Sequence, residues 1–123
     1  MRRTVFISLG AALTALGPLA WVNAGPVSIS PSELLANPDR FDGQAVTLQG
    51  TVEQFHDKVS PDGAPYVKFR VSDGPSAVRV FSLGRSPCRN GMQATVEGTF
   101  EKVNRLGRLP SYHAVTATHV TCR

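Results

Sequence analysis

Residues 48–55 read LQGTVEQF and residues 96–103 read VEGTFEKV, so nearly the same motif occurs twice with a glycine in the same place. Apolar and polar residues alternate in both copies, which is the period-two pattern of a half-buried β-strand. Gly50 and Gly98 lie in the inward phase, where a missing side chain lets a sheet bend sharply. We therefore expect two long strands that each serve both sides of a closed barrel. A chance likeness between two amphipathic strands is the alternative, because Thr and Val are common in strands.

The same alternation recurs along the rest of the chain and predicts five strands. The first begins at Val46, and the others are expected at 66–72, 77–83, 92–103 and 112–122. The segments between them are rich in turn-forming or polar residues, which predicts loops at 56–65, 73–76, 84–91 and 104–110. Ser30 or Ser32 can cap a short helix through Glu33 to Ala36, which Asn37-Pro38 would end.

Residues 1–24 have the layout of a secretory signal peptide. A basic opening at Arg2-Arg3 precedes an apolar run from Val5 to Ala20, and the segment ends on the small residue Ala24. The run is shorter than the roughly 20 residues that span a bilayer comfortably, so we expect cleavage rather than an uncleaved anchor. We then expect a linker at 25–30, one domain at 31–123, and a periplasmic or secreted protein.

The charge of the chain is only weakly informative about its partners. Thirteen Lys and Arg against nine Asp and Glu give a net charge of +4. Removal of residues 1–24 takes away Arg2 and Arg3, which leaves 11 basic residues and a net charge of +2. Only a clustering of the remaining cations would therefore favour a polyanionic partner.

Cys88 and Cys122 are the only cysteines of the chain. An even pair in an exported domain is most simply a disulfide, which here would pin the C-terminal strand to the 84–91 connection. A redox pair and a pair of metal thiolates remain the alternatives, although the spacing is not that of a CxxC motif.

These features together resemble the OB-fold, the five-stranded Greek-key barrel, and in particular small exported bacterial OB-fold domains of the anticodon-binding and nucleic-acid-binding type. The resemblance is carried by NPDRFDGQAVTLQGTV at 37–52, YVKFRVSDGPSAVRVF at 66–81, GMQATVEGTF at 91–100 and HAVTATHV at 113–120. It implies an all-β barrel with a short N-terminal helix. One departure is the short connection at 84–91, where OB-folds often place a helix.

The resemblance also implies where a ligand would bind, because OB-folds bind along strands two and three and the flanking loops. The outward phase of strands two and three holds Tyr66, Lys68, Arg70, Arg79 and Phe81. The flanking loops add His56, Lys58, Lys102, Arg105 and Arg108. Cations that follow phosphates and aromatic rings that stack bases are what single-stranded nucleic acid requires. The alternative is that these are ordinary solvent-facing residues of a sheet.

We therefore expect a binding module for single-stranded nucleic acid or another anionic oligomer, without enzymatic activity, cofactor or metal. An interaction module for an envelope protein or peptide is the second hypothesis. A cation-dependent phosphodiesterase is a third, although Asp57, Asp62, Glu53 and Glu101 show only ordinary strand and loop spacing. Heme handling is a fourth, because His119 is placed similarly to the histidine of the periplasmic heme chaperone of cytochrome c maturation. The tyrosine that follows four residues later in that family is replaced by Arg123.

Overall fold

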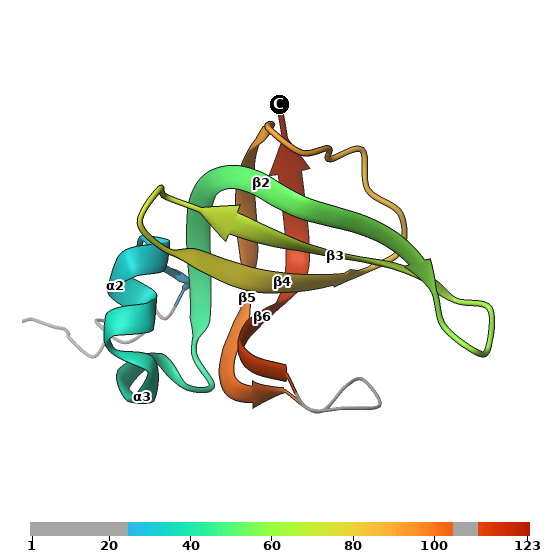
Figure 1. Cartoon of the computed structure of the whole chain (residues 1–123). Helices are drawn as coiled ribbons and strands as arrows, with labels where there is room; N and C mark the ends of the chain where they lie inside the picture. Colours follow the sequence, from blue (N-terminus) through green and yellow to red (C-terminus); the bar gives the residue numbers. More distant parts are fainter. Residues whose placement is uncertain (1–24, 105–110) are drawn as a thin grey trace, which may run out of the picture.

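The computed structural model describes residues 25–104 and 111–123 (Figure 1). The expected signal peptide lies outside the described residues, as do Arg105 and Arg108. The elements are β1 (Val27–Ser28), α2 (Pro31–Ala36), α3 (Pro38–Phe41), β2 (Ala45–Val59), β3 (Pro65–Ser72), β4 (Ala77–Leu83), β5 (Gln93–Asn104) and β6 (Ser111–Cys122). No helix among the described residues is long and apolar enough to cross a membrane.

The five long strands form a closed barrel. The strand order is β1-β2-β3-β4-β6-β5, and a further pairing of β2 with β5 closes the sheet on itself. All neighbours among the long strands are antiparallel except β4 and β6, which run parallel. This is the strand arrangement of the OB-fold, so the all-β, five-stranded barrel expected from the sequence is confirmed.

β2 bends sharply at the first glycine of the repeated motif. Ala45 to Thr51 pair with β5, whereas Thr51 to Val59 pair with β3. A Cβ on Gly50 would lie 2.9 Å from the carbonyl carbon of Ser72, closer than real Cβ atoms approach. Glycine is therefore required here because the backbone of β3 passes directly over this position.

The second glycine does the same for β5. One side of β5 pairs with β2 and the other with β6, and the β5–β6 register shifts between Glu97 and Gly98. A Cβ on Gly98 would lie 2.7 Å from the Cα of Ala117. The expectation that both long strands serve two sides of the barrel is thus confirmed, and it follows from two close backbone approaches.

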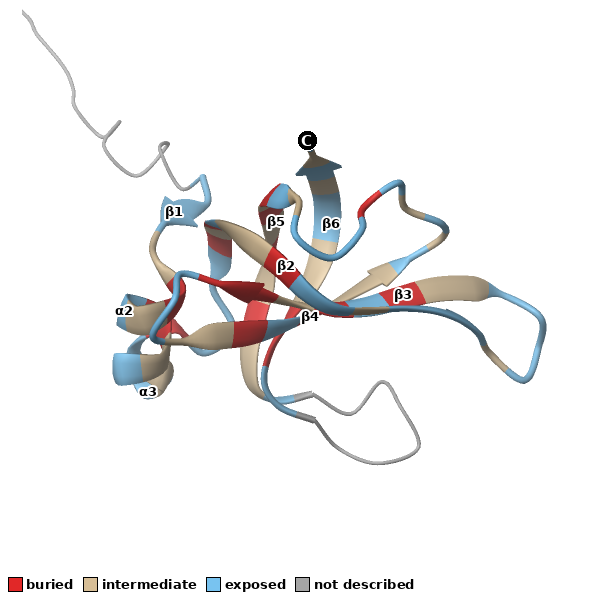
Figure 2. Ribbon diagram, turned by 45° about the horizontal axis from the view of Figure 1, so that its top comes forward, coloured by how far each residue is buried: buried red, intermediate tan, exposed pale blue. Residues whose placement is uncertain are grey.

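The core fills the barrel with the inward-facing residues of every long strand. Buried residues alternate with more exposed ones along β2, β3 and β4 (Figure 2). The fully buried side chains are mostly small and branched: Val46, Leu48, Val52, Val67, Val71, Val78, Val80, Val96, Phe100 and Val115. Branched residues of this kind suit the narrow interior of a five-stranded barrel.

Two short helices close one end of this barrel (Figure 1). The expected helix is confirmed as α2, and Ser30 and Glu33 form a reciprocal capping box at its start. Leu34 of α2 is fully buried in the core. α3 was not anticipated, since we expected Asn37-Pro38 to end helical structure; Pro38 instead starts α3 at a position where its missing N–H costs nothing. β1, within the expected linker, pairs parallel with β2.

The loop predicted at 56–65 is wrong for half of its length. β2 continues to Val59, β3 starts at Pro65, and only residues 60–64 form the turn. The extended β2–β3 hairpin projects beyond the barrel on the side opposite the helices (Figures 1 and 2). Both faces of β2 are exposed from His56 to Val59, so no hydrophobic alternation marks this part as a strand. A bulge at Gln54, whose φ is 52°, also interrupts the pattern.

The disulfide expected between Cys88 and Cys122 is present, with its Cα atoms 5.4 Å apart. It ties the β4–β5 connection to the end of β6. Two further contacts hold this connection against β2: the guanidinium of Arg89 lies 5.4 Å from the ring centroid of Phe55, and Asn90 Oδ1 accepts a 2.9 Å hydrogen bond from the Phe55 N–H. A helix is thus not needed to attach this segment to the barrel.

Candidate binding face

Strand register arranges the outward side chains of β2, β3, β4 and β6 in three parallel rows, which we call the β3–β4 face. Each row crosses the sheet through directly opposed residues. The first row is Lys58, Tyr66 and Leu83; the second is His56, Lys68, Phe81 and Thr116; the third is Glu53, Arg70, Arg79 and Ala114. All five residues expected on strands two and three therefore belong to one surface.

Burial confirms which side of β3 and β4 faces outward. Val67, Phe69 and Val71 of β3 are at most 2% exposed, and Val78 and Val80 of β4 are equally buried. The residues between them on each strand are exposed or partly exposed. Because successive side chains of a strand point to opposite faces, the β3–β4 face cannot turn into the core without expelling these valines.

The first two rows carry an aromatic pair. The rings of Tyr66 and Phe81 are 5.1 Å apart between centroids and tilted by 32°. Both side chains are only partly buried, and Leu83 beside Tyr66 is 74% exposed. Ring pairs at this separation stabilise each other, so the pair is a preformed aromatic surface at the hairpin end of the face.

The third row carries the arginines. Arg70 and Arg79 are directly opposite each other on β3 and β4, an arrangement in which like charges repel. Arg70 Nε is buried and has no hydrogen-bond partner among the described residues. Among residues 25–104 and 111–123, no ion pair involves Arg70, Arg79, Lys68 or Lys58. The positive charges of this face are therefore available to an anion, with Glu53 beside Arg70 as the nearest opposing charge on β2.

The flanking cations expected from the sequence are not all brought to this face. Lys58 is on β2, in the first row. Lys102 is on β5, where its Nζ forms an ion pair with Asp39 of α3. This pair raises the pKa of Lys102 and lowers the pKa of Asp39, mainly through the hydrogen bond between them. Lys102 is thus directed toward the helices, and its charge is already matched.

Leu83 of this face and Tyr112 of β6 were not chosen from the sequence. Leu83 was expected only as the end of a strand, and the short β3–β4 turn sets its register opposite Tyr66. Tyr112 is 57% exposed on β6. It precedes Ala114, the partner of Arg79, by two residues, and this relation depends on the parallel β4–β6 pairing.

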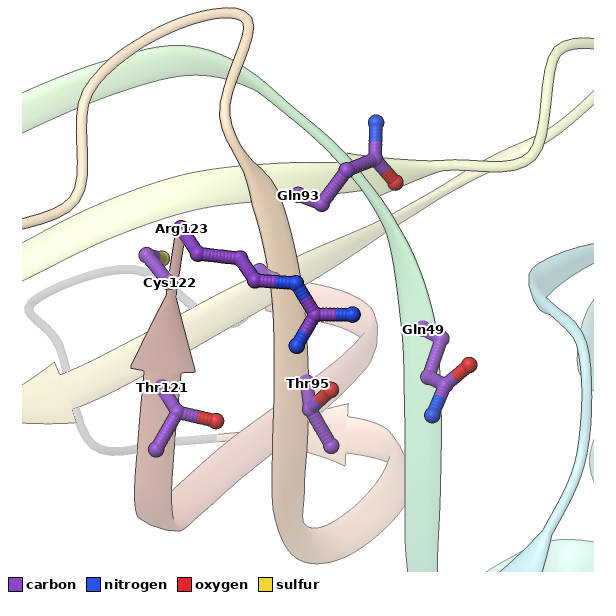
Figure 3. A pocket seen from close by; sticks show the side chains of 7 residues that line it. Gln49, Gln93, Thr95, Thr121, Cys122 and Arg123 are labelled. Atoms are coloured by element: carbon purple, nitrogen blue, oxygen red, sulfur yellow. The ribbon is translucent and has the colours of Figure 1, made fainter.

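A shallow depression lies on a different side of the barrel, over β2, β5 and β6 (Figure 3). Its volume is about 180 Å³, and Gln49, Gln93, Thr95, Thr121, Cys122 and Arg123 are among the residues around it. Pockets for small molecules usually enclose about 300–1,000 Å³ and are mostly apolar. This polar depression is therefore too small for a typical ligand or cofactor. Among the described residues, no group of three or more His, Cys, Asp or Glu is placed to hold a metal ion.

Comparisons with known proteins identify similar structures. A crystal structure of a protein assigned as an aspartyl-tRNA synthetase from Leishmania major Friedlin matches 79% of this chain with a TM-score of 0.58 and 15% identity. A structure of RecG bound to a three-way DNA junction matches 82% of this chain with a TM-score of 0.55 and 16% identity.

At these identities the likeness shows the fold alone, and this chain spans only 20% and 13% of the two proteins. No protein-family model matches the chain. No curated protein matches it by sequence either.

Proposed function

We propose that this protein is a binding module for single-stranded nucleic acid or another anionic oligomer, and that the ligand lies across the β3–β4 face. The observation that carries the proposal is the register of β3 and β4. It places Lys68 opposite Phe81 and Arg70 opposite Arg79, next to the Tyr66–Phe81 ring pair. Cations and exposed rings thereby alternate over adjacent rows of one surface.

The chemistry of this face matches a flexible, base-bearing anion. Base stacking on aromatic side chains contributes about 1–3 kcal/mol per base and tolerates any sequence. Arg and Lys side chains neutralise backbone phosphates and release condensed counterions, which makes such binding strongly dependent on salt. The bases of a duplex are already paired and stacked, so a duplex would gain little from the rings of this face. The two solved structures above also come from a tRNA synthetase and a DNA-bound protein.

The direct test is a titration of residues 25–123, with the disulfide formed, against a fluorescent single-stranded oligonucleotide at two salt concentrations. We expect micromolar affinity at low salt and a steep loss of affinity as salt increases. No binding at low salt would overturn the proposal. It would show that the cations of the face are ordinary solvated residues.

A protein partner in the cell envelope is the second candidate. It is favoured by the exposed apolar residues Val59 and Leu83, 60% and 74% exposed, near the end of the β2–β3 hairpin. Isolated large apolar side chains of this kind are also common on surfaces that bind nothing. Binding of this type would depend on Leu83 and Tyr66 and would vary little with salt, so the same titration separates the two candidates.

We further propose that the module is exported and has no catalytic activity. Export is supported by the Cys88–Cys122 disulfide, since disulfides persist in oxidising compartments. Mass spectrometry of protein secreted from its host tests cleavage after Ala24; an N-terminus other than Gly25 would contradict it.

A nuclease assay with added calcium tests the proposed lack of catalytic activity. Metal-dependent hydrolysis of the nucleic acid would contradict it.

A further inference from the structure

We propose that Tyr112 forms a second base-stacking position, on the far side of the arginine row from the Tyr66–Phe81 pair. This inference rests on the proposed function and deepens it. It identifies the ligand as one that carries aromatic bases along its backbone, rather than a plain polyanion. A base-bearing strand would place a base on each aromatic position and its phosphates on the arginines between them.

The placement of Tyr112 follows from the β4–β6 register. β4 and β6 run parallel, with Arg79 opposite Ala114 and Phe81 opposite Thr116. Tyr112 therefore lies two residues, about 7 Å, before the arginine row, while Phe81 lies two residues after it. Along the direction of these two strands, the order is therefore an aromatic position at Tyr112, a cationic position at Arg79 and a second aromatic position at Phe81. They span about 13 Å from Tyr112 to the level of Phe81.

The orientation of Tyr112 follows from its neighbour His113. The ring of His113 lies 6.3 Å from the ring of Phe100 between centroids, and Phe100 is fully buried in the core. His113 thus lies on the side of β6 that faces Phe100. Tyr112 and Ala114 alternate with it on the strand, so they lie on the opposite side. Tyr112 is 57% exposed, whereas Ala114 is 4% exposed.

The backbone at His113 does not shift the register of β6 against β5. Its φ of 55° is in the left-handed region and bends the strand locally. The register is the same on either side of this residue, with Ala114 opposite Glu101 and Tyr112 opposite Val103. Tyr112 therefore stays two residues from Ala114, the partner of Arg79.

The residue between the aromatic positions is small. Ala114 is opposite Arg79 and has the smallest side chain of the third row. No bulky group of β6 therefore separates Tyr112 from the guanidinium of Arg79 within this row.

The test compares Tyr112→Ala, Tyr112→Phe and His119→Ala in the oligonucleotide titration. We expect about tenfold weaker binding for Tyr112→Ala, within the range for loss of one stacked base. Tyr112→Phe should bind like the native protein because it keeps the ring. His119→Ala changes an exposed residue of the same strand that pairs with Glu97, away from the β3–β4 face, and should have no effect.

A parallel titration with inorganic polyphosphate, which has no bases, should show equal affinity for the native protein and Tyr112→Ala. Unchanged oligonucleotide binding by Tyr112→Ala, with weakened binding by Phe81→Ala, would overturn this inference and leave the proposed function standing. Absence of binding by the native protein would overturn both. Tyr112→Gln serves as a second variant if the alanine protein does not fold, and must show the same loss.

Discussion

Arg70 and Arg79 face each other on adjacent strands as a directly opposed pair. This arrangement is unfavourable for the folded protein, because directly opposed like charges repel. Arg70 Nε, buried and without a hydrogen-bond partner among the described residues, adds to the cost. An anionic ligand placed over this row would relieve the repulsion, which is why we assign the electrostatic part of binding to these two residues.

Charge reversal at this row tests that assignment. We expect Arg70→Glu and Arg79→Glu each to weaken oligonucleotide binding by about tenfold or more. Each should also reduce the log–log slope of the salt dependence by about 0.7 for every phosphate that the protein no longer neutralises. Arg123→Glu is the matched control, since Arg123 borders the polar depression over β2, β5 and β6. Equal losses for all three variants would show that only net charge matters.

Gly98 is a residue whose replacement tests the barrel itself. Gly98→Ala would bring a Cβ against the backbone of Thr116 and Ala117, so β6 must shift. Overpacking of this kind typically destabilises by about 1–3 kcal/mol, and each kcal/mol lowers Tm by about 4–8 °C in a domain of this size. Thermal unfolding followed by circular dichroism measures the change. Gly25→Ala, which meets no atom within 4 Å, should leave Tm unaltered.

The β4–β5 connection depends on one covalent link more than on secondary structure. Between Gly84 and Met92 the chain forms no helix or strand, yet Cys88 is fully buried. The disulfide closes a loop with a sequence separation of 34 residues. Loop closure of this length stabilises a folded chain by about 4 kcal/mol in the chain-entropy model.

Reduction of this disulfide should therefore lower the free energy of unfolding by about 2–4 kcal/mol. Urea denaturation with and without a reducing agent measures the difference. The Cys88→Ala/Cys122→Ala variant should be as unstable as the reduced protein and should not respond to the reducing agent. A native protein equally stable in both conditions would show that packing of Arg89 and Asn90 against Phe55 suffices to hold the connection.

The helices and turns of the molecule are held partly by carboxylates with lowered pKa values. Asp39 accepts a hydrogen bond from Lys102, and Asp62 accepts hydrogen bonds from the Ser60 hydroxyl and the Ala64 N–H. Asp73 accepts hydrogen bonds from the N–H groups of Ser32 and Ser76, 3.0 and 3.1 Å long, and so joins the β3–β4 turn to α2. For Asp73 the Ser32 side chain is the main cause, ahead of the two backbone N–H groups, and in all three cases the donors keep the pKa of the carboxyl below its usual value of 3.8.

Acid should therefore destabilise the protein in a defined window. A folded-state pKa below the unfolded value means that the stabilisation is present above about pH 4 and is lost as the pH falls through the lowered values. We expect Tm to change little between about pH 7 and about pH 5 and to decline below about pH 4. An Asp39→Asn/Asp73→Asn variant should show a shallower decline, whereas Asp57→Asn, on the exposed end of β2, should behave like the native protein. A decline that starts near about pH 6 would contradict this assignment to the three carboxylates.

Much of this architecture could be predicted from the sequence alone. The period-two alternation of apolar residues marks the barrel strands, because each inward position must be buried and each outward one must meet water. The two motif glycines mark where β2 and β5 bend, since only glycine tolerates the close backbone approach. Ser30 and Glu33 mark the start of α2 through their spacing, and the paired cysteines mark the disulfide. Each of these signals is local or depends on a single pair of residues.

Other features were decided only by the tertiary structure. The outer half of β2 carries no hydrophobic alternation, because it leaves the barrel and both of its faces meet solvent. Lys102 is drawn to Asp39 by the fold of α3 against β5. The parallel pairing of β4 with β6 places Ala114, two residues after Tyr112, opposite Arg79. Register between strands distant in sequence is set by barrel closure as a whole, so the sequence determined which residues face outward, and closure decided which of them meet.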